Sequence, residues 1–357
     1  MQWDKREMIK AAEALGLPNG ADNYKLIDQN QVMRKIKQRP PYLALEAGLL
    51  HYQNGRPSAL LAKAAFPENI CDGHYDAAPT IPLVDSGKAM DQAAAMLAME
   101  SRGLNGETIP LLKEISNLKG YAMEVFDPKS DYWIWGDREN GRINTKFFSG
   151  KTKNLLAGFG NWQYDFVDRA ELGKRTERRP LATAEIELEN AHQIDPEQLT
   201  VQTAPFFVLE RAFTGAAPNG NPKLRAEAHM PHETVAGHID NHKVMGPMHC
   251  CRVLAQAGIV LSKSVSEQPD AVPEVVSSKA AWYDSQFYFS PDEPLFVEVE
   301  AARIIRRRGG EMVVVKGAVS VAGRTICRTD NFTYMLIPKD KHVTAYTKSQ
   351  ITSAKYK

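Results

Sequence analysis

The chain contains one short pattern twice, and the two copies lie 164 residues apart. The first copy reads GHYDAAPTIPLVDSGKAMDQAA from Gly73, and the second reads GHIDNHKVMGPMHCCRVLAQAG from Gly237. Three separate landmarks keep this interval: Pro41 with Pro205, His74 with His238, and Gln92 with Gln256. A register kept over such a span predicts two copies of one domain, each with its own Gly-His pair.

The composition is that of a folded, water-soluble protein. The 357 residues suffice for two ordinary domains, with 43% hydrophobic and 24% charged residues. A formal net charge of +1 gives no reason to expect nucleic acid as a partner. The N-terminus lacks the apolar core of a signal peptide, and no stretch is apolar enough to cross a bilayer. We therefore expect a cytoplasmic protein without membrane insertion.

Hydrophobic periodicity predicts the same α+β module in both copies. A strand and its hairpin return precede each Gly-His pair (39–66 and 203–229), and a long helix follows it (84–101 and 244–262). Short strands then follow between 121 and 168, and from 286 to the end of the second copy. We expect each sheet to wrap its helix. The predicted divisions are a helical lead-in (1–31), a first domain (32–170), a charged connection (171–199), a second domain (200–340) and a tail (341–357).

These segments resemble a known enzyme family. PPYLALE, a Gly-His loop, and a proline-flanked entry to an Ala/Gln helix are similar to the FabA/FabZ type of β-hydroxyacyl-acyl-carrier-protein dehydratase. The resemblance covers about Val32 to Pro338, and the second copy matches more closely through AGHIDNHKVMGP and VLAQAG. It implies a tandem (double) hot-dog fold, in which the two halves form a pseudo-dimer with active sites at their seam.

The resemblance also implies the chemistry of the site. Dehydration of a 3-hydroxyacyl thioester removes a proton from C2 and expels hydroxide from C3. His74 and His238 match the family's catalytic histidine, whose pKa suits a general base. Backbone N–H groups at the start of the central helix would polarise the thioester carbonyl. The substrate-binding positions implied by the family pattern are Gly73, Leu83, Gly237 and Gly246.

The sequence departs from the family at the positions that this chemistry uses. Fourteen residues after each histidine, where the family has an acid on the partner helix, stand Lys88 and Arg252. A neighbouring cation would depress the pKa of the histidine. Nine residues after each histidine stand Leu83, which has an N–H, and Pro247, which has none. The first half therefore offers the better carbonyl-binding end, and neither half has the family's acid.

Three other carboxylates are candidates for the missing acid. Asp85 lies one helical turn before Lys88 and would share its face of the helix, and Asp91 lies three residues after it. Glu233 lies five residues before His238. We expect the composite site to pair His238 with Asp85 across the seam. Alternatively, Asp85 caps its helix, Asp91 is a buried ion-pair partner or a solvated residue, and Glu233 is an ordinary loop carboxylate.

Three functions stay open at this point. The first is dehydration of a 3-hydroxyacyl thioester carried by acyl carrier protein or CoA, in fatty-acid or polyketide-type synthesis. The second is a hot-dog thioesterase, because Gly-His-Ile-Asp-Asn is similar to the Gly-His-x-Asn loop of that branch. The third is a catalytically altered acyl-binding scaffold. A homodimer of the double hot-dog is a further possibility.

No cofactor or metal is expected. His242, His249, Cys250 and Cys251 lie close in the sequence, but side chains of adjacent helical residues point about 100° apart, which makes joint ligation awkward. The four cysteines are too few and too unevenly placed for a disulfide framework. We therefore interpret the cysteines as buried, small apolar residues of a protein from a reducing compartment.

Overall fold

The structure is a computed structural model that describes most of the chain. The described residues are 3–17, 23–74, 79–121, 124–171, 189–200, 202–204, 206–238, 245–268, 270–284, 292–307, 310–321, 323–339 and 341. The predicted tail, apart from its first residue, and the predicted strand at 286–290 lie outside them.

The N-terminal half consists of one long helix and seven strands, with short helices around them. Its elements are α1 (Lys5–Ala14), β1 (Tyr24–Asp28), α2 (Gln29–Ile36), β2 (Leu45–Gln53), β3 (Arg56–Ala64), η2 (Glu68–Cys71), α3 (Leu83–Ser101), β4 (Thr108–Gly120), β5 (Tyr132–Glu139), β6 (Arg142–Ser149) and β7 (Leu155–Asp168).

The C-terminal half has the same build. Its elements are β8 (Glu189–Ile194), η3 (Pro196–Leu199), β9 (Leu209–Ala216), β10 (Pro222–Ala228), α5 (His232–Val235), α6 (Pro247–Ser264), β11 (Ala271–Tyr283), β12 (Leu295–Arg307), β13 (Gly310–Val321) and β14 (Arg324–Pro338).

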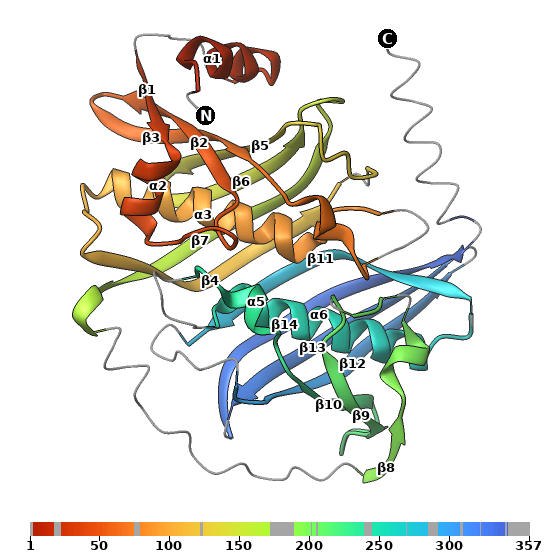
Figure 1. Cartoon of the computed structure of the whole chain (residues 1–357). Helices are drawn as coiled ribbons and strands as arrows, with labels where there is room; N and C mark the ends of the chain where they lie inside the picture. The colour runs from red at the N-terminus through yellow and green to blue at the C-terminus, as the bar shows by residue number, and fades with distance from the viewer. Residues whose placement is uncertain are drawn as a thin grey trace.

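All fourteen strands belong to one antiparallel sheet, whose order is β1-β2-β3-β5-β6-β7-β4-β11-β14-β13-β12-β10-β9-β8. From the central pair outward, the two halves list equivalent strands in the same order. The halves join where β4 pairs with β11, from Ser277 opposite Lys119 to Trp282 opposite Glu114. Figure 1 shows α3 and α6 in the middle of the molecule, each held by the strands of its own half.

The two long helices are almost wholly buried because their residues are small and apolar. Fourteen of the nineteen residues of α3 and thirteen of the eighteen of α6 are buried. Alanine and methionine favour the helix and let strands pack closely around it. One hydrophobic core runs through both halves. A second, smaller cluster lies where α1 packs on the sheet, around Met8, Leu49 and Trp135. The two helices predicted from the sequence are therefore confirmed.

Several predicted elements are wrong in type or extent. The lead-in contains a strand, β1, which pairs with β2 and thereby buries the side chains of Tyr24 and Ile27. The charged connection was expected to be partly extended, and part of it forms β8, which pairs with β9. The strands expected from 39 and from 203 begin only at Leu45 and Leu209. The seam strands β4 and β11 were not predicted.

Candidate functional site at the seam

The two Gly-His turns have the same construction and reach into the opposite half. Gly73 and Gly237 have φ of +72° and +81°, a region that favours glycine. A Cβ on Gly73 would lie 2.3 Å from the carbonyl oxygen of Thr203, and one on Gly237 would lie 2.3 Å from that of Arg39. The Thr203 and Arg39 amides donate hydrogen bonds of 2.7 Å to the two glycine carbonyls. The backbone of one half thus contacts that of the other at both glycines, while the role of the glycines in substrate binding stays a prediction.

Two buried glutamines, Gln92 and Gln256, repeat one set of hydrogen bonds in the two halves. In each case the side-chain oxygen accepts from one backbone amide, and the side-chain nitrogen donates to a carbonyl two residues earlier. The backbone partners are Ala44 and Tyr42 in the first half, and Val208 and Phe206 in the second. These bonds hold an aromatic ring of each half beside the histidine of the other. The ring centroids of Phe206 and His74 are 4.8 Å apart, and those of Tyr42 and His238 are 4.5 Å apart.

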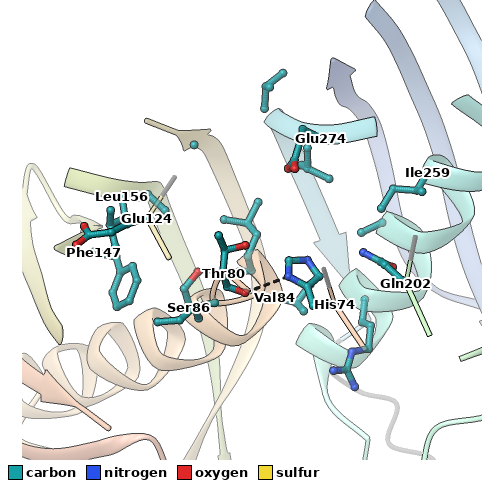
Figure 2. A pocket seen from close by; sticks show the side chains of 18 of the residues that line it. His74, Thr80, Val84, Ser86, Glu124, Phe147, Leu156, Gln202, Ile259 and Glu274 are labelled. Carbon is teal, nitrogen blue, oxygen red and sulfur yellow. Dashed lines mark hydrogen bonds between the residues drawn. The ribbon is translucent and has the colours of Figure 1, made fainter. Parts of the chain in front are cut away.

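His74 lines a cavity of about 310 Å³ at the seam. Its Nδ1 lies 3.0 Å from the Thr80 carbonyl oxygen. Because a carbonyl can only accept, Nδ1 carries the proton, and Nε2 is the basic nitrogen of the neutral ring. Figure 2 shows this bond at the centre of the cavity, with Glu124 and Glu274 on different sides of the ring.

The cavity wall is mostly apolar and comes from both halves. Side chains of α3, β5, β6 and β7 meet those of α6, β11 and β14 around it. The apolar lining residues are Ile81, Leu83, Val84, Tyr121, Tyr132, Phe147, Leu156, Ala157, Phe206, Ala255, Ile259, Val275, Val276, Met335 and Ile337. Such a wall with a few polar groups is typical of a site for a ligand with a hydrocarbon chain.

Several polar side chains share this cavity with His74, among them Arg252, Gln202, Glu274 and Glu124. Arg252 comes from α6, so the cation predicted to face the first histidine does line its cavity. Gln202 also lines the wall. Glu274, on β11, is only 9% exposed, and Glu124 accepts hydrogen bonds from Ser149 and Thr152. The two glutamates were not predicted from the sequence, because β11 and the segment before β5 gave no recognisable motif.

The starts of the two central helices differ. Helix α3 begins at Leu83 after Pro82, without a side-chain cap, and Leu83 lines the His74 cavity. The first amides of a helix have no partner within it, so this end can polarise a carbonyl. Helix α6 begins at Pro247, and the Gly246 N–H already donates to His249 Nδ1 at 2.9 Å. The backbone of the two helix starts differs as predicted, while carbonyl binding by the first half stays a prediction.

His238 lies in more crowded surroundings than His74. A Cβ on Gly246 would lie 2.2 Å from its Cε1, so the backbone passes directly beside the ring. The ring centroid of His249 is 5.7 Å from that of His238. Burial and the neighbouring His238 hold the pKa of His249 well below its usual range. Among the described residues, the nearby cavity is lined by Tyr42 and His249 and not by His238.

The predicted catalytic residue Asp85 lies between the two cations. Its carboxylate is 3.9 Å from Lys88 Nζ and 3.8 Å from Arg252 Nη2. Its Oδ2 is buried and has no hydrogen-bond partner among the described residues. Asp85 lines the cavity on the His249 side and does not line the His74 cavity. The pairing of Asp85 with His238 stays a prediction.

The other two carboxylate candidates lie in different environments. Asp91 is fully buried, and its Oδ1 accepts a hydrogen bond of 2.7 Å from the Tyr164 hydroxyl. Burial raises the pKa of Asp91 to about 7. Within the described residues, Asp91 therefore has a tyrosine as its partner and forms no ion pair. Glu233 is exposed and lies at the rim of the cavity that Asp85 lines.

The described residues form no group of three or more side chains suited to a metal ion. His242, one of the residues considered as a metal ligand, lies outside the described residues. All four cysteines are buried free thiols that take part in no disulfide bond, as the sequence predicted. Burial raises the pKa of Cys251 to about 12. None of the described helices has the length and hydrophobicity that crossing a membrane requires.

Comparison with known proteins identifies the fold. No family model and no curated protein matches the sequence. Among solved structures, the dehydratase domain of a mycocerosic acid synthase-like polyketide synthase aligns with a TM-score of 0.59 at 12% identity, over 84% of this chain and 97% of that domain. The dehydratase domain of PpsC from Mycobacterium tuberculosis, in complex with C12:1-CoA, gives 0.53 at 13% identity, over 83% and 99%.

A third similar structure is an inactive mutant of the CurJ dehydratase, in which a histidine is replaced by phenylalanine. It aligns with a TM-score of 0.57 at 9% identity, over 85% of this chain and 98% of that one. At such identities the likeness establishes the fold alone. The chain shares the fold of polyketide synthase dehydratase domains, which confirms the prediction of a hot-dog-type α+β fold.

Proposed function

We propose that this protein is a 3-hydroxyacyl-thioester dehydratase in which His74 is the general base. The observation that carries the proposal is the position of His74: its Nδ1 is fixed by the Thr80 carbonyl, and its ring faces an apolar cavity at the start of α3. The two halves would act as a pseudo-dimer of hot-dog domains, related to the FabA/FabZ type. The substrate would be carried on acyl carrier protein or CoA.

The reaction follows from the groups in the cavity. The acyl chain lies along the apolar wall, and the thioester carbonyl oxygen accepts from the first amides of α3, near Leu83. His74 Nε2 takes a proton from C2, the C2–C3 double bond forms, and the C3–O bond breaks. The departing hydroxide takes a proton and leaves as water.

The proton donor for the hydroxide differs from the one that the family pattern implies. Arg252 occupies the family position, and a guanidinium does not give up its proton at neutral pH. It can instead stabilise the negative charge that develops on the thioester oxygen. We assign the acid role to Glu274, the buried carboxyl that lines the same cavity from β11.

The comparisons support this proposal through what those proteins are. The three similar structures are dehydratases, one with a bound acyl-CoA and one inactivated by replacement of a histidine.

The test is incubation of the purified protein with 3-hydroxyacyl-CoA and 3-hydroxyacyl-pantetheine thioesters of increasing chain length. Mass spectrometry of the products should show the 2-enoyl thioester, and water should add to the enoyl thioester in the reverse direction. Absence of both reactions at every chain length would refute the proposal.

A second candidate function, thioester hydrolysis, is favoured by Arg252. An arginine can stabilise an oxyanion without supplying a proton, and His74 could activate water for attack on the thioester. Release of free thiol in the same incubations, without enoyl product, would show this activity. Neither product, together with retained binding of the acyl thioester, would favour the scaffold.

A further inference from the structure

A second cavity, of about 390 Å³, lies between the two halves. We call it the axis cavity because its wall contains residues from both copies of the repeat at equivalent positions. Four pairs with the 164-residue interval line it: Tyr42 with Phe206, Val84 with Met248, Asp85 with His249, and Lys88 with Arg252. It shares Val84, Phe206 and Arg252 with the His74 cavity, but His74 does not line it.

Its inner wall carries two buried cations held in place by aromatic rings. Lys88 Nζ lies 4.3 Å from the centroid of the Tyr42 ring, and the Arg252 guanidinium lies 4.3 Å from that of Phe206. The side chains of Lys88 and Arg252 are only 18% and 13% exposed. These cation–π contacts fix the two positive groups but do not neutralise them.

Asp85 is the carboxylate beside both cations, and it does not satisfy either one. Its distances of 3.9 Å to Lys88 and 3.8 Å to Arg252 exceed hydrogen-bond length. One negative charge faces two positive charges, and a buried charge without close pairing is costly. The Oδ2 atom of Asp85 is itself buried without a hydrogen-bond partner in the described part of the chain. The site therefore lacks one acceptor group for the cations and one donor for Asp85.

His249 supplies neither of these groups. Its Nδ1 accepts from the Gly246 amide, so its Nε2 carries the proton and donates to the Thr234 carbonyl at 3.2 Å. The ring is therefore neutral and fully used. Two further carboxylates, Asp72 and Glu233, line the rim of the cavity, where both are exposed and solvent screens their charge.

We propose that the axis cavity binds a small hydroxycarboxylate. The ligand carboxylate would accept hydrogen bonds from Arg252 and Lys88, a geometry that suits the planar guanidinium. The ligand hydroxyl would donate to Asp85 Oδ2. The short hydrocarbon part would lie against Phe66, Pro67 and Met248, which line the same cavity. The inference shares Arg252 with the reaction proposed for the His74 cavity, but binding of the hydroxycarboxylate does not require that reaction to occur.

Calorimetric titration of the intact chain tests the proposal with three matched probes. These are 3-hydroxyhexanoate, hexanoate without the hydroxyl, and 3-hydroxyhexanamide without the charge. We expect 3-hydroxyhexanoate to bind most tightly, and loss of either group to weaken binding about tenfold or more. This comparison uses the unaltered protein and needs no variant. Absence of binding, or equal binding of the amide, would overturn the proposal.

Variants then locate the site. Lys88→Gln should weaken binding of 3-hydroxyhexanoate about tenfold. Lys316→Gln, which alters an exposed lysine of β13 that pairs with Glu300 of β12, should leave this binding unchanged. Asp85→Asn should reduce the preference for the hydroxylated acid over hexanoate.

The His74→Gln variant should retain binding of 3-hydroxyhexanoate. If His74→Gln abolished binding while Lys88→Gln did not, the ligand would lie in the His74 cavity. Turnover of thioesters is measured separately, so the two proposals can fail independently.

Discussion

At the scale of single residues, the two Gly-His sites have diverged within a common frame. Leu83 keeps an amide at the position where Pro247 has none, and Asp85 stands where the second copy has His249. The His74 ring faces a cavity, while the backbone at Gly246 passes beside the His238 ring. We infer that these substitutions at equivalent positions favour the first half as the site of the proposed reaction.

The first prediction concerns the two histidines. His74→Gln should lower kcat for dehydration at least about 100-fold, because it removes the general base. His238→Gln should change kcat by less than about tenfold, since in the proposed reaction His74, and not His238, takes the proton. Steady-state kinetics with a 3-hydroxyacyl thioester, on variants shown to be folded by circular dichroism, checks this. The reverse order of the two effects would transfer the active site to the second half.

The second prediction concerns the acid. Glu274→Gln should lower kcat with little change in KM, because the amide keeps the shape of the side chain but cannot protonate the departing hydroxide. Asp85→Asn, in the axis cavity, is the matched carboxylate-to-amide control and should have the smaller effect on kcat. A larger loss in Asp85→Asn than in Glu274→Gln would instead support the sequence prediction for Asp85.

The third prediction uses the buried carboxyl of Asp91, whose pKa is about 7 in the folded state against 3.8 as its ordinary value. The folded state holds this proton more tightly than the unfolded state. Its contribution to stability is therefore present at low pH and is lost as pH rises from about 4 to about 7. Asp91→Asn, which still accepts from Tyr164, should remove this loss.

Urea unfolding at two pH values measures the effect. The free energy of unfolding of Asp91→Asn, minus that of the unaltered chain, should rise by about 2 kcal/mol or more from about pH 5 to about pH 8. An equal change at both values would show that the carboxyl does not titrate with folding in this range.

At the scale of elements, the turns and seam strands connect the halves. The prediction here is that Gly73→Ala destabilises the protein by more than about 2 kcal/mol. The new Cβ would collide with the Thr203 carbonyl, and the alanine would have to keep the positive φ of Gly73. Gly103→Ala is the control: Gly103 has a φ of +65° but nothing within 4 Å of its Cβ position. It should cost only about 1 kcal/mol in denaturant unfolding. Equal costs would mean that the contact between halves carries no energy.

The strands β4 and β11 were not predicted because their side chains do not alternate regularly along the sequence. Their pairing with β7 and β14 contains register shifts, between Leu112 and Glu114, for example, and between Val275 and Ser277. Each bulge moves the following side chains to the other face, so the alternation of period two is lost. Both strands also contain a proline, at Pro110 and Pro273, a residue that is uncommon in the interior of a strand.

At the scale of the whole molecule, one continuous sheet and one core make the halves a single structure. We predict that Ser278→Pro, in β11 between β4 and β14, destabilises both halves together by more than about 3 kcal/mol. Ala191→Pro, in the edge strand β8, is the control and should cost less. Denaturant unfolding followed by tryptophan fluorescence and by circular dichroism should give one shared transition. Two separate transitions in the unaltered chain would contradict this.

The sequence by itself determined the repeat, the two central helices, the Gly-His pairs and the positions of Lys88 and Arg252 fourteen residues after the histidines, because each depends on local pattern or on a fixed interval. Only the tertiary structure decided that β4 and β11 form the seam, that His74 has the open cavity, and that Asp85 lies between Lys88 and Arg252. These features depend on residues far apart in the chain, and neither periodicity nor spacing records which of them meet across the two halves.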